Sequence, residues 1–525
     1  METLDAAQRV VVVGGGATGC WAARALTQAG VRVLLLEAGS WPASAAQTAV
    51  APQAPLDAHE ERARLRATRA QRTTQRVQRG CYAFTPATAS LFVSDAAQPY
   101  AVGDATPYRW IRVRAVGGRT LVWNGIALRM LERDFDALRP DGAWPVGLPE
   151  LERHYRDAEA FFGLTGERAH APSALEHHAR RAIARRWPGR PVVSAPHFRS
   201  TAAQPEPAVA ALPSFSSRDA LGAAHASGRL ELRTDSFVSR LELDADGRRI
   251  AAAEVVDART RERVRVTGRA FVLCASALES TRLLLNSACA QHPSGLGNAS
   301  GLLGSYLSDH LVGVSALGVR QMRDGSPPAV VQPAAPHVTE LYFPPFRDGA
   351  RGDAADFAGT YGIQAYLEAP AADVREGRCV LHAFGTVLPQ RENGVRLDPA
   401  LRDALDVPAL RIAARYGENE ARMAADQAQA LAALTAVLGY RLVRLSTKPD
   451  IPGTSMHEVG TARMGRRPEH SVLDPWNCTW GVDNLFVTDG ACFGEMGAAN
   501  PTLTMLAITG RACEQIGERM HAGAL

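Results

Sequence analysis

The sequence predicts an α/β fold in which a doubly wound, Rossmann-like nucleotide-binding domain is interrupted by an inserted α+β domain with an antiparallel sheet. Three observations predict it. A glycine-rich turn follows a β-branched run near the N-terminus, a similar strand and helix occur near the C-terminus, and alternating apolar residues occupy the region between them. A chain of 525 residues is also too long for one hydrophobic core, so two or more domains are expected.

The first element is a βαβ unit. Val10–Val13 is predicted as a buried parallel strand, and the turn Gly14-Gly15-Gly16 follows it directly. Ala17–Ala29 has the pattern of a helix with Gly30 as its C-cap, and the apolar run Val31–Leu36 predicts the second strand. The crossover of such a unit is right-handed, so the helix packs back onto the sheet.

The same domain is expected to resume after an excursion with weak periodicity, which has a helical pattern at Glu60–Arg76. Strand-like runs return at Leu230–Leu243, Phe271–Cys274 and Asn484–Asp489, and a helix is predicted through Leu503–Met520. The nucleotide-binding domain is therefore assigned to residues 1–40, 106–150, 215–315 and 455–525, with the excursion or lid at 41–105.

Residues 151–214 and 316–454 are assigned to the inserted, substrate-binding domain. A long helical pattern occupies Glu420–Leu438, near the end of this region. Five alternating segments predict its antiparallel sheet, namely Thr339–Phe343, Gly359–Glu368, Cys379–Val387, Val395–Leu397 and Leu410–Ala414.

Composition indicates neither a nucleic acid nor a membrane as a partner. The formal net charge is only +4, no dense basic run occurs, and no apolar stretch reaches the roughly 18 residues of a membrane span. The eight cysteines form no C-x-x-C pair, so we expect reduced thiols, no disulfide framework and no metal site. The polar segment Met1–Arg9 lacks a signal-peptide pattern, which makes the cytoplasm the expected compartment.

The segment Gly14-Gly15-Gly16-Ala17-Thr18-Gly19 fits the G-x-G-x-x-G motif of a dinucleotide site. Gly14 permits the tight turn, Gly16 lets a pyrophosphate approach the backbone, and Gly19 lets the helix pack on the strand. The amide groups at the helix N-terminus, Ala17 and Thr18 among them, then face the anion. Glu37 lies 23 residues after Gly14 (37 − 14), where a carboxylate accepts hydrogen bonds from the ribose hydroxyls. The motif alone does not distinguish NAD from FAD.

Further segments resemble the glucose–methanol–choline family of flavoenzymes, and the resemblance extends from Arg9 to about Ile516. They are Glu37-Ala38-Gly39, Val116-Gly117-Gly118-Arg119-Thr120, Trp123-Asn124-Gly125, Ala275-Ser276-Ala277-Leu278-Glu279-Ser280 with Leu283-Leu284, and the C-terminal segments that contain His457 and Asn500. The resemblance implies FAD as the cofactor and an alcohol as the substrate. It also implies cofactor contacts at Ala38, Gly117, Gly118, Thr120, Asn124, Gly125, Val238, Asp489, Gly490, Pro501 and Thr502.

One departure from the family concerns the attachment of the flavin. Thr120-Leu121-Val122-Trp123 resembles the pyranose-oxidase branch, in which a histidine before the tryptophan is joined covalently to the flavin. Val122 occupies that position here and has no nucleophile. Non-covalent FAD is therefore expected.

Two segments carry the expected chemistry, the one that begins at His457 and the one that contains Asn500, 43 residues later (500 − 457). In the resembling family such a pair faces the flavin ring. A neutral imidazole can remove the hydroxyl proton of an alcohol while the hydride leaves for flavin N5. The amide of Asn500 can donate to the same oxygen, and a helix that begins near Pro501 would direct its positive end at the flavin.

Other polar residues are interpreted more plainly. Asp309-His310 matches a recurring pair of the family, and we interpret it as structural. His382 and Tyr366 lie on the inserted sheet, where either a packing role or a place in the pocket is open.

The expected reaction is oxidation of a primary or secondary alcohol, such as a sugar, cyclitol or glycoside, to an aldehyde or ketone. We favour oxygen as the electron acceptor over a dye or quinone, since no cytochrome-type C-x-x-C-H occurs in the chain. Three alternatives stay open: a non-redox lyase on this fold, a nicotinamide dehydrogenase, and a non-catalytic nucleotide-binding protein. Bleaching of a bound flavin by alcohols under anaerobic conditions distinguishes all three from the expected enzyme. The oligomeric state stays open.

Overall fold

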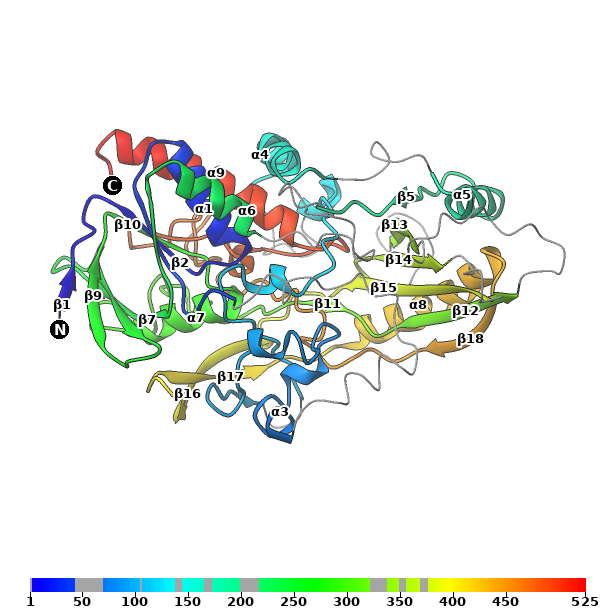
Figure 1. Cartoon of the computed structure of the whole chain (residues 1–525), viewed down its shortest axis with the longest axis horizontal. Coiled ribbons are helices and arrows are strands. Elements are labelled where there is room, and N and C mark those ends of the chain that lie inside the picture. Colours follow the sequence, from blue (N-terminus) through cyan, green and yellow to red (C-terminus); the bar gives the residue numbers. More distant parts are fainter. Residues whose placement is uncertain are drawn as a thin grey trace.

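The computed structural model describes residues 2–42, 69–103, 106–136, 144–164, 172–198, 217–321, 338–348, 356–368 and 376–525. At the centre of one lobe is a parallel sheet of five strands (Figure 1). In spatial order these are β19 (Leu485–Val487), β10 (Ala270–Leu273), β2 (Val10–Val13), β3 (Val33–Leu36) and β6 (Leu230–Arg233).

The parallel sheet forms because its central strands are apolar along their whole length and are covered by helices. All four valines of β2 are buried, with β10 and β3 on either side of them. Helices α1 (Ala17–Gln28), α6 (Arg218–Ala226) and α9 (Thr502–His521) lie together on one side of the sheet, and α7 (Ala277–Asn286) lies on the other in Figure 1. Helix α4 (Leu148–Phe161) packs on α9. The predicted doubly wound domain is confirmed.

A second sheet of four strands packs beside the first. Its order is β1 (Glu2–Leu4), β9 (Arg263–Thr267), β8 (Ile250–Asp257) and β7 (Ser236–Leu243). The predicted run Leu230–Leu243 is thus divided between two sheets, because Asp235 has a left-handed backbone (φ 54°) that ends β6 before β7 begins. Strand β1 was not expected, since two of its three residues are polar and exposed.

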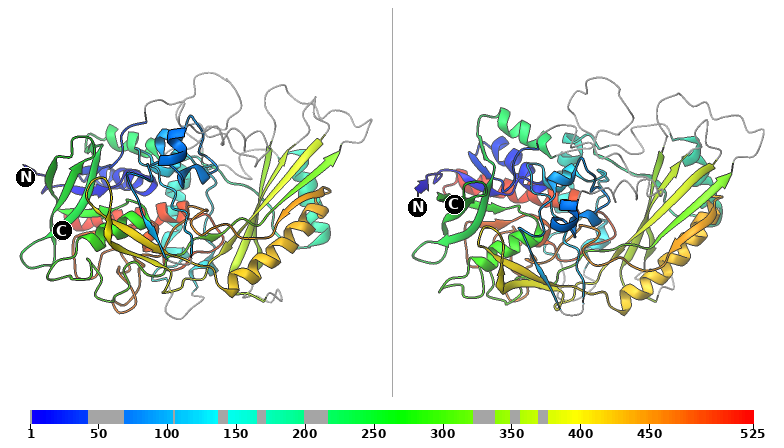
Figure 2. Two further views of the ribbon diagram at one scale, coloured as in Figure 1. Left: turned by 90° about the horizontal axis from the view of Figure 1, so that it is seen from below. Right: turned by 60° about the horizontal axis from the view of Figure 1, so that its bottom comes forward.

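The other lobe contains a sheet of seven strands, which we call the roof sheet. Its order is β18 (Arg441–Ser446), β12 (Ser315–Gln321), β15 (Glu376–Thr386), β14 (Thr360–Glu368), β13 (Val338–Asp348) and β5 (Val193–Ser194), with β11 (His310–Leu311) beside β15. Figure 2 shows α8 (Glu418–Val437) along one face of this sheet, with the opposite face turned towards the rest of the molecule. Helix α5 (Ala174–Arg186) lies at the far end of the lobe.

Alternation along the strands gives the roof sheet two different faces. Ile363 and Leu381 are fully buried in the core that α8 covers. The intervening residues point the other way, so that Gln364 lies opposite His382 in the register of β14 and β15. The roof sheet therefore presents a polar face to the first lobe.

One predicted strand pairing is wrong. We expected Val395–Leu397 and Leu410–Ala414 in the inserted antiparallel sheet, but they lie in β16 (Gly394–Arg402) and β17 (Pro408–Ala413) of a separate three-stranded sheet with β4 (Ala101–Val102). The alternating pattern identifies a strand but contains no information about its partner. Here the partner of β17 comes from residues 101–102, more than 300 positions away in the sequence.

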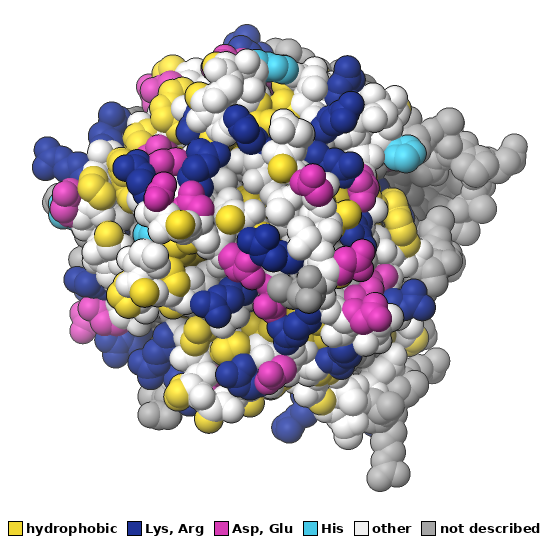
Figure 3. All heavy atoms as spheres, turned by 90° about the vertical axis from the view of Figure 1, so that its left-hand side faces the viewer, with side chains coloured by type: hydrophobic (Ala, Val, Ile, Leu, Met, Phe, Trp, Pro, Cys, Tyr) yellow, Lys and Arg dark blue, Asp and Glu magenta, His cyan; other side chains and the backbone are white. Residues whose placement is uncertain are grey.

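Other expectations concern the excursion and the surface. Of the helix predicted at Glu60–Arg76, residues 60–68 lie outside the described residues, and α3 spans Arg69–Thr74. The proposed domain boundaries stay a prediction. In the part of the chain that the structure describes, no helix is long and apolar enough to cross a membrane. On the face that contains β1 and the C-terminus, acidic and basic side chains are interspersed (Figure 3).

The packing of α8 on the roof sheet can be tested at Gly318 on β12. A Cβ atom there would lie 2.6 Å from Cγ2 of Thr435 and 2.8 Å from Cβ of Tyr440. Gly318→Ala should therefore lower the free energy of unfolding by about 1–3 kcal/mol, as overpacking of a core does. Gly222→Ala is the matched control, since Gly222 is exposed on α6 with nothing within 4 Å of its Cβ position. It should raise stability by up to about 1 kcal/mol. Equal unfolding midpoints for Gly318→Ala and the unaltered chain would contradict this packing.

Candidate functional site

A cavity of about 900 Å³ extends from the glycine turn after β2 to the polar face of the roof sheet. It brings together most of the site residues predicted from the sequence. These are Gly14, Gly16, Ala17, Thr18, Glu37, Ala38, Gly118, Thr120, Asn124, Val238, His457, Asp489, Gly490, Asn500, Pro501 and Thr502. His382 and Tyr366, whose role the sequence left open, also line it, whereas Gly19, Gly117 and Gly125 are not among its lining residues.

The first glycine turn forms one end of the cavity. Gly14 has φ 100°, and a Cβ there would lie 2.5 Å from the Cys274 carbonyl oxygen, so no other residue fits. A Cβ on Gly19 would lie 1.7 Å from the Gly14 oxygen, which is why α1 can approach β2 so closely. Gly16 has open space above it, and no side chain caps α1. The free amide groups of this helix end suit a pyrophosphate.

Glu37 is held by the backbone at the end of β3. Its Oε2 accepts a hydrogen bond from Gly15 N (2.6 Å), and its Oε1 accepts one from Gly39 N (2.7 Å). Burial raises the pKa of this carboxyl, although the two backbone bonds oppose that effect. Each oxygen keeps a second lone pair, and the side chain lines the cavity. The residue is therefore placed to accept hydrogen bonds from a ribose.

A second glycine turn meets the first. Gly117 and Gly118 have φ 104° and 54°, and a Cβ on Gly118 would lie 3.0 Å from the Cα of Gly16. The Thr120 hydroxyl donates to the Gly117 oxygen (2.6 Å) and accepts from Ser217 N (3.1 Å). The Thr120 hydroxyl thus holds the turn, even though the residue lines the cavity.

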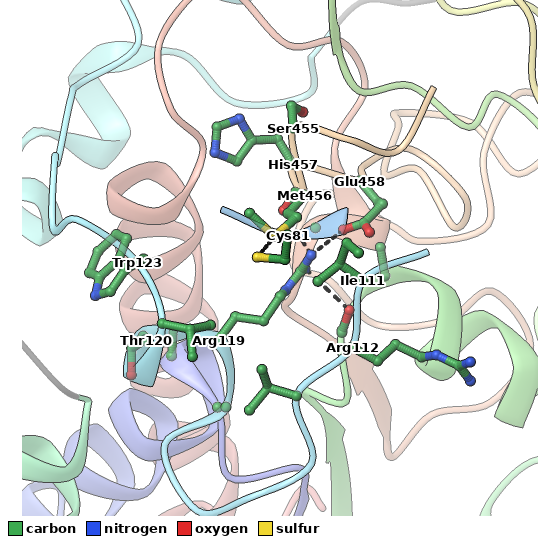
Figure 4. Close-up of a pocket in the computed structure, with 18 of the residues that line it drawn as sticks. Cys81, Ile111, Arg112, Arg119, Thr120, Trp123, Ser455, Met456, His457 and Glu458 are labelled. Carbon is green, nitrogen blue, oxygen red and sulfur yellow. Dashed lines mark hydrogen bonds and ion pairs between the residues drawn. The ribbon is translucent and has the colours of Figure 1, made fainter. Parts of the chain in front are cut away.

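Arg119, which was not predicted as a site residue, joins this turn to the segment that contains His457. Its guanidinium donates to the Met456 carbonyl (2.8 Å) and pairs with the Glu458 carboxylate (2.5 Å), as Figure 4 shows. Burial opposes the charge of Arg119, but the nearby Glu458 carboxylate raises the arginine's pKa on balance. A charged residue inside a glycine turn is the signal that could have identified it.

His457 is held by a second histidine. Its Nδ1 lies 2.8 Å from Nδ1 of His310, whose Nε2 lies 2.8 Å from the Gly497 carbonyl oxygen. Burial lowers the pKa of His310 to about 4, so this ring is neutral at pH 7. Burial also lowers the pKa of His457 well below its usual range, with smaller contributions from His310 and Arg119. Both imidazoles are therefore uncharged.

The tautomers of the two rings follow from the Gly497 carbonyl, because a carbonyl oxygen can only accept. His310 must donate through Nε2, so its Nδ1 carries a lone pair and accepts the Nδ1 proton of His457. Nε2 of His457 is then unprotonated. No described residue hydrogen-bonds to this nitrogen, which is left to the cavity that His457 lines.

Asp309 and His310 together position His457. The structural role predicted for this pair is therefore to hold a residue of the site. Oδ1 of Asp309 accepts hydrogen bonds from the backbone of His310 (2.9 Å), from the backbone of His457 (3.0 Å) and from the Ser455 hydroxyl. Burial and the charge of Glu458 raise the pKa of Asp309 to about 7. The sequence contained this pair, but its contact with His457 spans almost 150 residues.

The C-terminal segments supply the remaining polar groups. Asp489 accepts hydrogen bonds from the Ser280 hydroxyl (2.5 Å) and from Ala491 N (3.0 Å), and burial raises its pKa to about 6. Asn500 is buried immediately before α9, and its Oδ1 accepts from Nε2 of Gln364 at 3.0 Å. Gln364 was missed, although strand alternation places it on the same face as Tyr366.

These features fit an extended dinucleotide such as FAD. One end has uncapped amides, an open glycine and a buried carboxylate, and the other has His457 and Asn500. Within the described ranges, no group of three histidine, cysteine or acidic residues is placed to hold a metal ion.

Comparison with known families agrees with this geometry. The family model described as "FAD dependent oxidoreductase" matches residues 9–293, and the one described as "GMC oxidoreductase" matches residues 389–509. The first match covers more than half of the chain and contains both glycine turns.

Curated relatives and a solved structure are similar over nearly the whole length. The chain is 28% identical to 2-methyl-1,2-propanediol dehydrogenase of Mycolicibacterium austroafricanum, over 97% of this chain and 95% of that protein. It is 26% identical to 6'''-hydroxyparomomycin C oxidase of Streptomyces lividus, over 99% and 93%. Its fold is similar to that of pyridoxine 4-oxidase from Mesorbium loti, with a TM-score of 0.62 and 21% identity over 97% and 98% of the two chains. The chain therefore belongs to the FAD-dependent oxidoreductases, as an enzyme of the glucose–methanol–choline (GMC) family.

Proposed function

We propose that this enzyme oxidises a primary or secondary alcohol group of a sugar, cyclitol or glycoside to an aldehyde or ketone. The observation that supports the proposal most strongly is the hydrogen-bonded pair of neutral histidines, which leaves an unprotonated Nε2 of His457 in the cavity. Two alternatives differ from this proposal in their use of a cofactor. A lyase on this fold would need no acceptor for a hydride, and a nicotinamide enzyme would be purified without flavin.

His457 is the proposed base. When the substrate hydroxyl lies within hydrogen-bond reach of Nε2, this nitrogen takes the hydroxyl proton as the C–H bond breaks. His310 keeps the ring in the required tautomer and accepts the Nδ1–H bond throughout. The low pKa of His457 keeps it neutral at pH 7, so nearly all of the resting enzyme has a base ready to accept.

Asn500 is the proposed partner of the base. Its Oδ1 is already occupied by Gln364, so its amide N–H groups are available to the substrate oxygen. A donor at this position stabilises the negative charge that develops on that oxygen as the proton leaves. FAD, when bound in this cavity, supplies the acceptor for the hydride and its two electrons. Glu37 and the two glycine turns would hold it without a covalent bond, since Val122 has no nucleophile.

The substrate class is supported by the polar face of the roof sheet. Gln364, Tyr366 and His382 from this face line the cavity, as do Ser315 and Ser446 from the neighbouring strands β12 and β18. Hydroxyl, amide and imidazole groups suit a ligand with several hydroxyls. Several relatives are named for such substrates, including the fructose dehydrogenase large subunit of Gluconobacter japonicus, which is 26% identical over 80% of this chain and 83% of that protein.

Oxygen is the proposed electron acceptor. After the reaction His457 carries the substrate proton in a buried site, and its positive charge would stabilise negative charge that develops on oxygen. The relatives include both oxidases and dehydrogenases, so an enzyme linked to a dye or quinone is the alternative.

The cofactor and the way it is bound can be tested on the purified protein. The purified protein should be yellow, and acid precipitation should release all of the flavin into the supernatant. The absorbance of supernatant and pellet measures this directly. Flavin that stays with the pellet would contradict non-covalent binding. Comparison with Cys81→Ser would then show whether Cys81, a thiol that lines the cavity, is the attachment point.

The catalytic pair can be tested by stopped-flow measurement of flavin reduction under anaerobic conditions. His457→Ala should slow reduction by roughly 10²- to 10⁴-fold, because the proton then has no positioned acceptor. Asn500→Ala should slow it less, since the base remains. Both variants should keep the flavin spectrum, which controls for loss of the fold. Reduction at an unaltered rate in both would show that another pair performs the chemistry.

The acceptor can be tested with enzyme reduced anaerobically by its substrate or by dithionite. On mixing with air-saturated buffer, the oxidised flavin spectrum should return within milliseconds to seconds, and hydrogen peroxide should form in equal amount. Return over many minutes, with rapid turnover only on quinone dyes, would identify a dehydrogenase instead.

A further inference from the structure

A chain of hydrogen bonds runs from the second glycine turn through the roof sheet to Asn500. Nδ2 of Asn124 lies 3.2 Å from the Tyr366 hydroxyl, which in turn lies 3.3 Å from Oε1 of Gln364. Nε2 of Gln364 then lies 3.0 Å from Oδ1 of Asn500. Gln364 and Tyr366 are both buried and both on β14, two residues apart, so their side chains lie on the same face.

The direction of this chain is set at its start by a backbone group. Ile126 N can only donate, and it donates to Oδ1 of Asn124 (3.4 Å), so the Asn124 amide nitrogen must face Tyr366. Burial raises the pKa of Tyr366 well above its usual range, so its hydroxyl keeps the proton that it donates to Gln364. Each residue of the chain therefore donates a hydrogen bond to the next one, from Asn124 to Asn500.

The last link determines which end of the Asn500 amide meets the substrate. Because Gln364 donates to Oδ1, the amide nitrogen of Asn500 is turned away from the roof sheet. No described residue accepts a hydrogen bond from that nitrogen, and Asn500 lines the cavity. An asparagine rotated by 180° would instead present its oxygen, which repels the oxygen of an alcohol that is losing its proton.

We propose that Gln364 is a positioning residue that fixes the Asn500 amide with its N–H groups towards the substrate oxygen. The Asn124–Tyr366 pair in turn fixes Gln364 through the same chain of hydrogen bonds. The proposal rests on the proposed function, in which Asn500 is the donor to that oxygen. It gives the roof sheet a part in the chemical step in addition to substrate recognition.

The test uses the flavin-loaded enzyme and the rate of anaerobic flavin reduction at saturating substrate. Gln364→Met keeps the size of the side chain but removes the donor, so the Asn500 amide loses its preferred orientation, and reduction should slow about 10-fold. Tyr366→Phe keeps Gln364 but removes the hydroxyl that directs it, and should slow reduction by a few-fold. Gln429→Met is the matched control, on the exposed face of α8, and should leave the rate unchanged.

A double-mutant cycle separates positioning from direct contact with the substrate. If Gln364 acts through Asn500, Gln364→Met should have no further effect in an Asn500→Ala background. Independent, multiplying effects of the two substitutions would overturn the proposal and make Gln364 a substrate contact. If Asn500→Ala alone leaves the rate unaltered, the proposed role of Asn500 fails instead, so the two failures are distinguishable.

Gln364→Glu provides a second readout that a purely structural role would not move. The carboxylate can only accept, so at high pH it should draw the Asn500 amide nitrogen towards itself and slow reduction by about 10- to 100-fold. When protonated, the acid can donate to Asn500 and accept from Tyr366, as glutamine does. The ratio of variant to unaltered rate should therefore rise towards one as the pH falls. A ratio that is independent of pH would contradict the proposal.

Discussion

The close approach of backbone segments at the end of β2 is the constraint on which the rest of the molecule depends. Four glycines meet there, namely Gly14, Gly16, Gly19 and Gly118. A Cβ on three of them would lie too close to neighbouring backbone atoms, and a Cβ on Gly16 would occupy space that a ligand needs. The turn lies at the carboxyl edge of a parallel sheet, where the chain leaves each strand for a helix or a loop. The glycine turns define one end of the cavity, and the roof sheet lies over the other.

Backbone groups of fixed polarity determine how the hydrogen bonds at that other end are directed. A carbonyl, that of Gly497, makes His310 donate and so leaves His457 with a free lone pair. An amide, that of Ile126, begins a chain that leaves Asn500 with free N–H groups. One acceptor and one donor thus line the same cavity, and the proposed oxidation of an alcohol requires both. Neither arrangement needs a charged side chain in the resting state.

Burial keeps the histidines of the site neutral. The pKa of His457 and that of His310 are both lowered by burial, so the two imidazoles stay neutral and can form a hydrogen bond without repelling each other. One ion pair lies beside the site: Arg119 contacts Glu458, and the guanidinium also holds the backbone of Met456 next to His457. The proposed base, His457, is therefore neutral in the resting site.

The local pattern of residues was enough to predict the βαβ unit, the glycine turn, Glu37 and the pair of His457 and Asn500. Each of these depends on neighbouring residues or on a segment with a characteristic composition, such as the glycines that only a tight turn requires. The contacts Asp309–His457 and Gln364–Asn500 join residues about 150 and 136 positions apart. Periodicity could place Gln364 on a face of a strand but could not show what that face would meet.

The sequence by itself thus determined the class of fold and the cofactor, and it named the residues to which the proposed function gives roles. The tertiary structure alone decided how strands pair and how hydrogen bonds are directed. The division of residues 230–243 between two sheets and the pairing of β17 with β4 depend on long-range packing. The tautomer of His457 and the orientation of Asn500 depend on single backbone groups far away in the chain. Local patterns contain no information about such partners, because only the folded chain brings them within hydrogen-bond distance.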